Sequence, residues 1–160
     1  WSGDCSGIFA TCTLLMHTAK NVTANFDPIP KYTLTVSSVN GSVSSSPAGI
    51  SNCQTSNCTA DFTQNTNVTI TATPATGYSF SSWTGDCNAA SANICFVTMS
   101  AAKNVTANYT QLATYLLTVN SANGSVSSNP AGINNCQTSN CSASFVQNTN
   151  VSLKIGRAHV

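Results

Sequence analysis

Charged residues are scarce in this chain of 160 residues. Only 6% of the residues are Asp, Glu, Lys or Arg, the sequence has no Glu and a single Arg, and the formal net charge is +1. Proteins that hold phosphate groups need clustered Lys and Arg side chains, which this sequence lacks. We therefore expect no nucleic-acid partner.

Long apolar runs are also missing. No stretch is long enough to span a bilayer, and no signal peptide begins at Trp1, so we expect no membrane insertion of this fragment. Low charge combined with only 8% aromatic residues is found in some disordered chains. Here, however, 41% of the residues are apolar and many alternate with polar residues, which indicates strands that bury one face.

A repeat divides the chain. One unit begins YTLTVSSVNGSVSSSPAGI at Tyr32, and the next begins YLLTVNSANGSVSSNPAGI at Tyr115, so the period is 115 − 32 = 83 residues. That length suits a small domain. We predict four segments: the back half of a unit with a linker (1–31), a complete unit (32–114), the front half of a unit (115–154) and a tail (155–160).

The tail departs from the repeat. Where the complete unit has ATPATG from Ala72 to Gly77, the last six residues are IGRAHV, which is similar to a translated sequencing adapter. We expect this segment to be non-native. No functional role is therefore assigned to Arg157 or His159.

Apolar and polar residues alternate through much of the unit. The alternation predicts strands from Tyr32 to Ser37, from Val68 to Thr73 and from Val105 to Tyr109. Asn40-Gly41 predicts a hairpin turn that returns the chain along residues 42–45. No helical stripe is present, so the expected fold is mainly β, with tandem small β-sheet domains of about five or six short strands and little or no helix.

Eight cysteines fall into four close pairs: Cys5 with Cys12, Cys53 with Cys58, Cys87 with Cys95, and Cys136 with Cys141. Because the pairs repeat with the unit, they predict local disulfides that pin loops, and an oxidising compartment. A zinc site formed by the two pairs of the complete unit is the alternative. Its spacings are wider than those of zinc ribbons and no His recurs nearby, so we favour disulfides and expect no metal and no cofactor.

The motifs occur in a fixed order: YTLTV, NGSV, SPAGI, a short Cys–Cys loop, VTITATP, GYSFSSWTGDC and KNVTANY. This set resembles the divergent internalin B-repeat family of bacterial surface and secreted proteins over nearly all of residues 1–153. The resemblance implies an extracellular or cell-surface location, frequent tandem arrays and small β-grasp-like domains. It brings no catalytic constellation with it.

Titratable residues are few, and the repeat shows which of them the unit requires. His17 corresponds to Ser100 and Asp61 to Ser144, so neither is retained between copies. Asp86 does recur, as Asp4. Because no second acid is nearby, a turn-capping role is favoured over catalysis or calcium binding. We therefore expect no catalytic residue and no enzyme activity.

Trp83, whose counterpart is Trp1, is the most informative aromatic residue. Exposed beside Asp86, it would form a platform for a sugar. The interpretation that we favour is that Trp83, Tyr78 and Phe80 fill the core of a domain that has few large side chains.

These features favour a non-enzymatic repeat module of an extracellular bacterial protein, acting as a spacer, stalk or adhesion domain. Two alternatives stay open. One is a carbohydrate-binding accessory module of a secreted hydrolase, and the other is a self-assembling fibre subunit in which complementary half units join head to tail. The partners to expect are surface glycans, other extracellular proteins or further copies of this chain.

Overall fold

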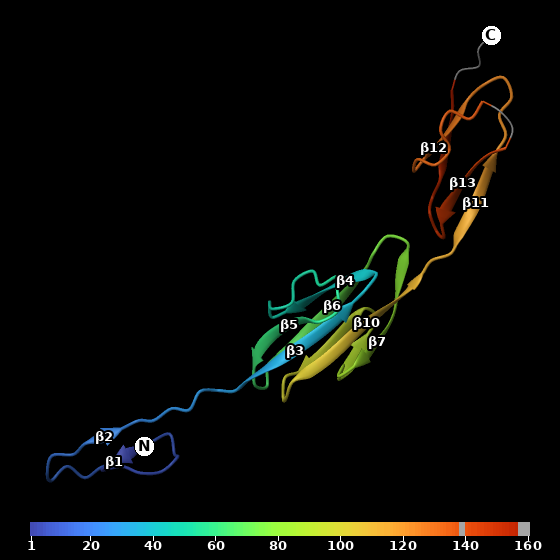
Figure 1. Ribbon diagram of the computed structural model, residues 1–160. Helices are drawn as coiled ribbons and strands as arrows, with labels where there is room; N and C mark the ends of the chain where they lie inside the picture. Colours follow the sequence, from blue (N-terminus) through green and yellow to red (C-terminus); the bar gives the residue numbers. More distant parts are fainter. Residues whose placement is uncertain (138–139, 157–160) are drawn as a thin grey trace. The chain divides into compact units, whose positions relative to one another are not determined.

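The computed structural model describes residues 1–137 and 140–156 (Figure 1). These residues form fourteen strands, and no helix occurs among them. The described residues therefore include no helix of the length and hydropathy needed to cross a membrane. The expected fold class is confirmed: the chain is mainly β, with several small sheets and disulfide-pinned loops. Arg157 and His159 lie outside the described residues.

The complete repeat unit forms two four-stranded sheets. Their strand orders are β5-β3-β10-β7 and β4-β6-β9-β8. The strands are β3 Lys31–Ser38, β4 Gly41–Ser46, β5 Cys58–Thr63, β6 Asn67–Pro74, β7 Tyr78–Gly85, β8 Ala89–Ser91, β9 Ile94–Thr98 and β10 Lys103–Gln111. The unit thus has eight strands and not the expected five or six. The two additional strands are β7, which carries aromatic residues, and β8, which consists of small residues.

One apolar core lies between the two sheets. Alternating residues of β3 and β10 in the first sheet pack with alternating residues of β6 and β9 in the second. Val36 and Ile70, from opposite sheets, are each 0% exposed. Burying a side chain of this size contributes about 1.5–3 kcal/mol to the free energy of folding. The apolar side chains at the alternating positions therefore stabilise the unit through their burial. The three strands predicted from the alternation are confirmed.

The consecutive strands β3 and β4 do not pair with each other. The predicted hairpin at Asn40-Gly41 is therefore wrong: β4 belongs to the second sheet and pairs antiparallel with β6, with Val43 opposite Ala72. Asn40 does have a positive φ of 71°. Gly41 does not, and it is needed for another reason, because a Cβ there would collide with the ring of Tyr109.

Strand β10 has neighbours that run in opposite directions. It is antiparallel to β7 and parallel to β3, with Lys103 opposite Leu34. Continuing this register places Lys31 level with Ser100, and Gln111 is 111 − 100 = 11 residues farther along. At about 3.3 Å per residue, the chain enters and leaves the complete unit at points separated by about 36 Å along the strands.

The chain divides into two compact units, Trp1–Lys31 and Tyr32–Val160. The first contains the short antiparallel pair β1 Ser2–Gly3 and β2 Val22–Thr23. Gly3 pairs with Val22, as Gly85 pairs with Val105 in the complete repeat unit. Residues 1–26 therefore repeat the local pairing of the back half.

Residues 114–155 repeat the front half. Strands β11 Thr114–Val119 and β13 Cys141–Val146 pair with each other, as do β12 Val126–Asn129 and β14 Ser152–Ile155. Val126 lies opposite Ile155, at the positions of Val43 and Ala72 in the complete unit. Strand β14 thus reaches one residue into the segment expected to be a non-native tail.

Candidate ligand platform around Trp83 and Asp86

All eight cysteines are joined in disulfides, in the four pairs that the spacing predicts. Their Cα–Cα distances run from 5.7 to 6.3 Å. Cys53 and Cys95 are buried in the core, so each disulfide of the complete unit ties a loop to it. This pairing overturns the zinc alternative, because it leaves no thiolate as a ligand. Among residues 1–137 and 140–156, no three His, Cys, Asp or Glu side chains gather as a metal site would require.

Asp86 lies just after the end of β7, where it closes the pair that β7 forms with β10. Its backbone N–H donates to the carbonyl of Asn104 at 2.7 Å, and its Oδ2 accepts from the N–H of Asn104 at 2.8 Å. Gly85 before it has a φ of 92°, and a Cβ there would collide with the Asn104 carbonyl. The Gly-Asp pair is therefore a device that ends the strand pair.

The first partial unit uses the same device. The N–H of Asp4 donates to the carbonyl of Asn21 at 2.8 Å, and Asp4 Oδ2 accepts from the N–H of Asn21 at 2.8 Å. The hydrogen bond from the Asn21 N–H to the carboxylate is the larger cause that holds the pKa of Asp4 below its ordinary value, and the Lys20 ammonium at 3.1 Å is the second. Because both copies use the carboxylate within the fold, the geometry supports the turn-capping interpretation for Asp4 and Asp86.

Trp83 is half-buried and packs against the core. Its ring centroid is 5.4 Å from that of Phe80, and Phe80 meets the ring of Tyr109 edge-on at 6.1 Å. A β-bulge makes this cluster possible: Trp83 lies opposite Ala107, but Phe80 lies opposite Tyr109, so one extra residue of β7 falls between them. Trp83 and Phe80 can therefore share a face although three positions separate them.

The same two rings also line a shallow depression of about 720 Å³. Its other lining residues are Ser81, Ser82, Ala90, Ala92 and Asn93. The indole N–H of Trp83 is buried and has no hydrogen-bond partner among the described residues. Asp86 does not line the depression, so the structure separates the two residues that the sequence placed in one platform. Trp83 packs against the core and also lines the depression, so it combines the core interpretation with the surface interpretation.

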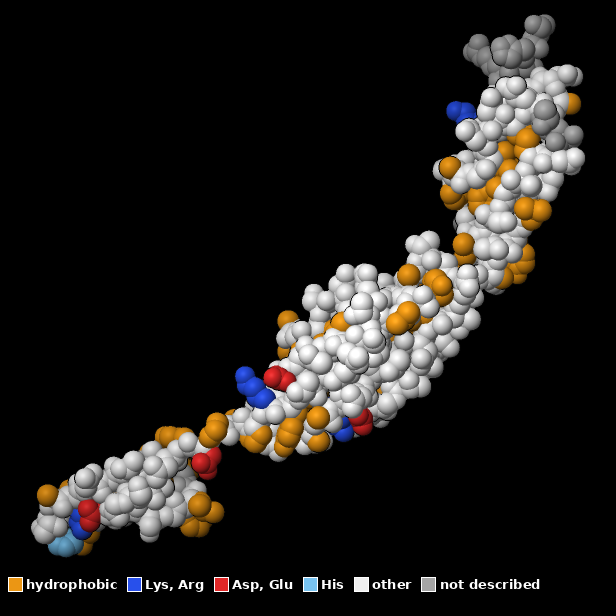
Figure 2. Space-filling model, in the orientation of Figure 1, with side chains coloured by type: hydrophobic (Ala, Val, Ile, Leu, Met, Phe, Trp, Pro, Cys, Tyr) orange, Lys and Arg blue, Asp and Glu red, His pale blue; other side chains and the backbone are white. Residues whose placement is uncertain are grey.

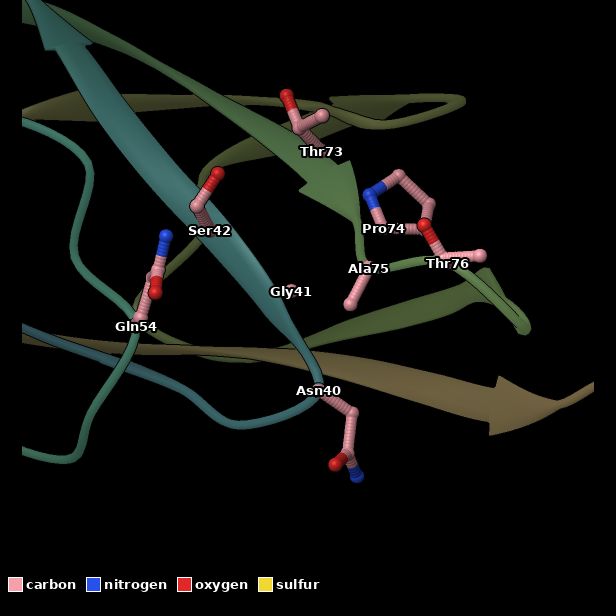
Figure 3. A pocket seen from close by; sticks show the side chains of 8 residues that line it. All are labelled: Asn40, Gly41, Ser42, Gln54, Thr73, Pro74, Ala75 and Thr76. Atoms are coloured by element: carbon pink, nitrogen blue, oxygen red, sulfur yellow. The ribbon is translucent and has the colours of Figure 1, made fainter.

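A second depression, of about 370 Å³, lies where β4 begins and β6 ends (Figure 3). It is lined by Asn40, Gly41, Ser42, Gln54, Thr73, Pro74, Ala75 and Thr76. Ser42 and Thr73 are cross-strand neighbours, and their hydroxyls are both seen in Figure 3. Since none of these eight side chains titrates near neutral pH, this depression offers hydrogen bonds but no acid or base.

Residues 32–113 match the family described as the divergent InlB B-repeat domain. No curated protein and no solved structure matches the chain. The matched residues are the complete unit, with its two sheets and both of its disulfides. The chain belongs to the divergent InlB B-repeat family.

Proposed function

We propose that the chain is a non-enzymatic spacer or stalk segment of an extracellular bacterial protein. The family match suggests an extracellular repeat module. The observation that carries the finer proposal is the parallel pairing of β3 with β10. Because the first and last strands of the complete unit run in the same direction, the chain leaves that unit about 36 Å farther along than it enters. Each repeat therefore adds length, as a stalk requires.

The surface and the crosslinks fit this role. On the face shown in Figure 2, the few charged side chains are scattered and most of the surface is neutral and polar. Such a surface attracts neither polyanions nor polycations. Each disulfide closes a short loop and limits its opening, which protects loops from proteolysis outside the cell.

The length of an array tests the proposal. One or two further copies of residues 32–114 would be inserted after Thr114, and the maximum dimension measured by small-angle X-ray scattering. We expect an increase of about 36 Å per copy from the rise of the strands. An increase that follows the cube root of the mass would contradict the proposal, because it would indicate copies packed into one globule.

The depression beside Trp83 supports a second candidate, carbohydrate binding. Aromatic rings stack on sugars, and the lining adds two hydroxyls and an amide from Ser81, Ser82 and Asn93. A glycan array would compare the chain with Ser82→Trp, which fills the depression and leaves the core intact, and with Phe96→Ala, which removes an exposed ring of β9 outside it. Binding that only Ser82→Trp abolishes would support this candidate. If the unmodified chain binds no glycan, the candidate fails.

A further inference from the structure

The depression beside Trp83 lies along a free edge of the complete unit. β7 is the last strand in the order β5-β3-β10-β7, and no described strand pairs with its second edge (Figure 1). The four successive residues 80–83 all line the depression. Because successive side chains of a strand point to opposite faces, a hollow bordered by four of them follows the edge of the strand. The remaining lining residues come from β8 and its turn into β9.

Three local irregularities border this depression. The β-bulge of β7 adds a residue between Phe80 and Trp83. Among the described residues, Ala92 is the one residue other than Gly and Asn that has a positive φ, of 49°. Asn adopts this conformation readily and Ala rarely does. The indole N–H of Trp83 is buried and lacks an acceptor among the described residues. Bulges, strained residues and unpaired buried donors are all typical of functional sites, so their coincidence indicates a ligand site.

The lining offers apolar contact and uncharged hydrogen-bonding groups. The rings of Phe80 and Trp83 are inclined to each other by 51°, and β8 and its turn add the methyl groups of two alanines. The side-chain N–H of Asn93 donates to the carbonyl of Ala72 at 2.7 Å. This bond fixes the amide and leaves its Oδ1 without a hydrogen-bond partner among the described residues. None of the described residues that line the depression carries a charge, so a neutral ligand fits it best.

We propose that this depression binds an N-acetylated amino sugar through the acetamido group of the sugar. The inference rests on the carbohydrate-binding candidate and narrows it to one class of sugar. An acetamido group combines a methyl group, an acceptor carbonyl and a donor N–H in one compact planar unit. A hydroxyl at the same position of the sugar would leave the apolar part of the depression without a contact.

Each part of the acetamido group has a matching group in the depression. The methyl group packs on the inclined rings of Phe80 and Trp83 and on the alanine methyl groups. The acetamido N–H donates to Oδ1 of Asn93. The acetamido carbonyl accepts from the indole N–H of Trp83 after a small rotation of this ring. A buried donor without a partner costs free energy, so supplying its acceptor favours the bound state.

A sugar is favoured over an extended peptide, although both carry amide groups. A peptide strand would add along the free edge of β7, where it needs a regular row of backbone N–H and C=O groups. The bulge between Phe80 and Trp83 interrupts this row, because its extra residue breaks the alternation. A sugar needs no such row, and the C–H groups of its ring can stack on an aromatic face.

Two matched trisaccharides test the proposal on the full chain. The first is the β-1,4-linked trimer of N-acetylglucosamine, and the second is cellotriose, which has hydroxyls in place of the acetamido groups. Binding is followed by ¹H–¹⁵N NMR, in which the two Trp residues give two indole N–H signals. The signal of Trp83 should shift. That of Trp1 should stay, because its N–H already donates to the carbonyl of Phe9 at 2.8 Å. We expect the acetylated trimer to bind at least about tenfold more tightly than cellotriose.

The outcomes separate this inference from the candidate on which it rests. If both trisaccharides shift the Trp83 signal and bind equally well, carbohydrate binding stands and the acetamido inference is wrong. If neither trisaccharide binds, both are wrong. An N-acetylated alanine tripeptide that binds as tightly as the acetylated trimer would also overturn the inference, because the sugar ring would then contribute nothing.

A pair of variants on β8 locates the binding site. Ala90 lines the depression and its neighbour Ala89 does not. Both are exposed, and they point to opposite faces of the strand, so neither change should unfold the unit. Ala90→Leu fills the space for the methyl group and should weaken binding of the acetylated trimer at least about tenfold, whereas Ala89→Leu should leave it unchanged. Circular dichroism checks that both variants fold. Retained binding by folded Ala90→Leu, or equal loss in both variants, would contradict this site.

Discussion

Met99 and Met16 occupy the same position of the repeat and have opposite environments. Met99 is fully buried in the complete unit, and Met16 is two-thirds exposed in the first partial unit. Both follow a cysteine by four residues and precede a lysine by four. Their local sequences are alike, so the difference comes from the sheet that lies opposite. A strand of this family is amphipathic by sequence, but its apolar face is buried only where the other half of the unit is present.

The largest expected effect is on this methionine pair. Met99→Ala should lower the free energy of unfolding of the complete unit by about 2–5 kcal/mol, because it leaves a cavity between two sheets. Met16→Ala should change stability by no more than about 0.5 kcal/mol in the monomeric chain, where the side chain is exposed. Urea denaturation followed by circular dichroism measures both. Equal effects of the two substitutions would show that Met16 is buried in solution as well.

The second comparison concerns the disulfides of the front half. Cys53–Cys58 and Cys136–Cys141 each close a loop with a sequence separation of 5. Replacing either pair by alanines should destabilise its own unit by about 2 kcal/mol through the loss of loop-closure entropy. Hydrogen exchange read out by mass spectrometry can follow the two units separately. A partial unit that loses all protection while the complete unit keeps its core would show how much the smaller sheets depend on the crosslink.

A smaller effect is expected at Tyr109, whose counterpart in the first partial unit is Phe26. The hydroxyl of Tyr109 donates to the carbonyl of Ser42 at 3.2 Å and lies 3.1 Å from the hydroxyl of Ser38. Tyr109→Phe should cost about 1 kcal/mol, the usual net value of such hydrogen bonds. Phe26→Tyr is the control and should be neutral, because Phe26 is exposed. Thermal unfolding of both variants provides the comparison.

The smallest effect is the pH dependence of the Asp4 turn. The backbone N–H of Asn21 and the Lys20 ammonium lower the pKa of Asp4 in the folded chain. A lowered folded pKa means that this carboxylate stabilises the β1–β2 pair above its unfolded pKa of about 3.9, and that the contribution is lost as the pH falls through the lower, folded value. An NMR titration of the Asp4 carboxyl carbon and the Asn21 amide measures this. An Asp4→Asn chain should lack the transition at the Asn21 amide.

Much of the fold could be read from the sequence, because the signals were local. Alternating apolar residues marked β3, β6 and β10, and the repeated spacing of cysteines predicted all four disulfides. Asp86 could be interpreted as a turn residue because its Gly-Asp-Cys setting recurs at Asp4. These features depend on neighbours within a few residues, which the sequence displays directly.

The errors came from contacts between distant segments. The NG pair at Asn40 indicated a hairpin, but Gly41 is small because the ring of Tyr109 packs on it from β10. Strict alternation would place Phe80 and Trp83 on opposite faces, whereas the bulge in β7 lets them share one. Asp86 does not line the depression beside Trp83, because its carboxylate accepts a hydrogen bond from the Asn104 backbone at the end of the strand.

The sequence alone therefore predicted the repeat, its period, its alternating strands β3, β6 and β10 and its crosslinks, because each rests on short-range patterns that recur in register. The pairing of those strands needed the folded chain: β3 and β4 separate into two sheets, and β3 joins β10 from the far end of the unit. The physical reason is that side-chain alternation specifies which face of a strand is buried, but backbone hydrogen bonds along its edge accept any strand of suitable direction. Packing against the opposite sheet selects the strand that pairs at each edge. The same packing buries Met99, whereas Met16 has no opposite sheet among the described residues and is exposed.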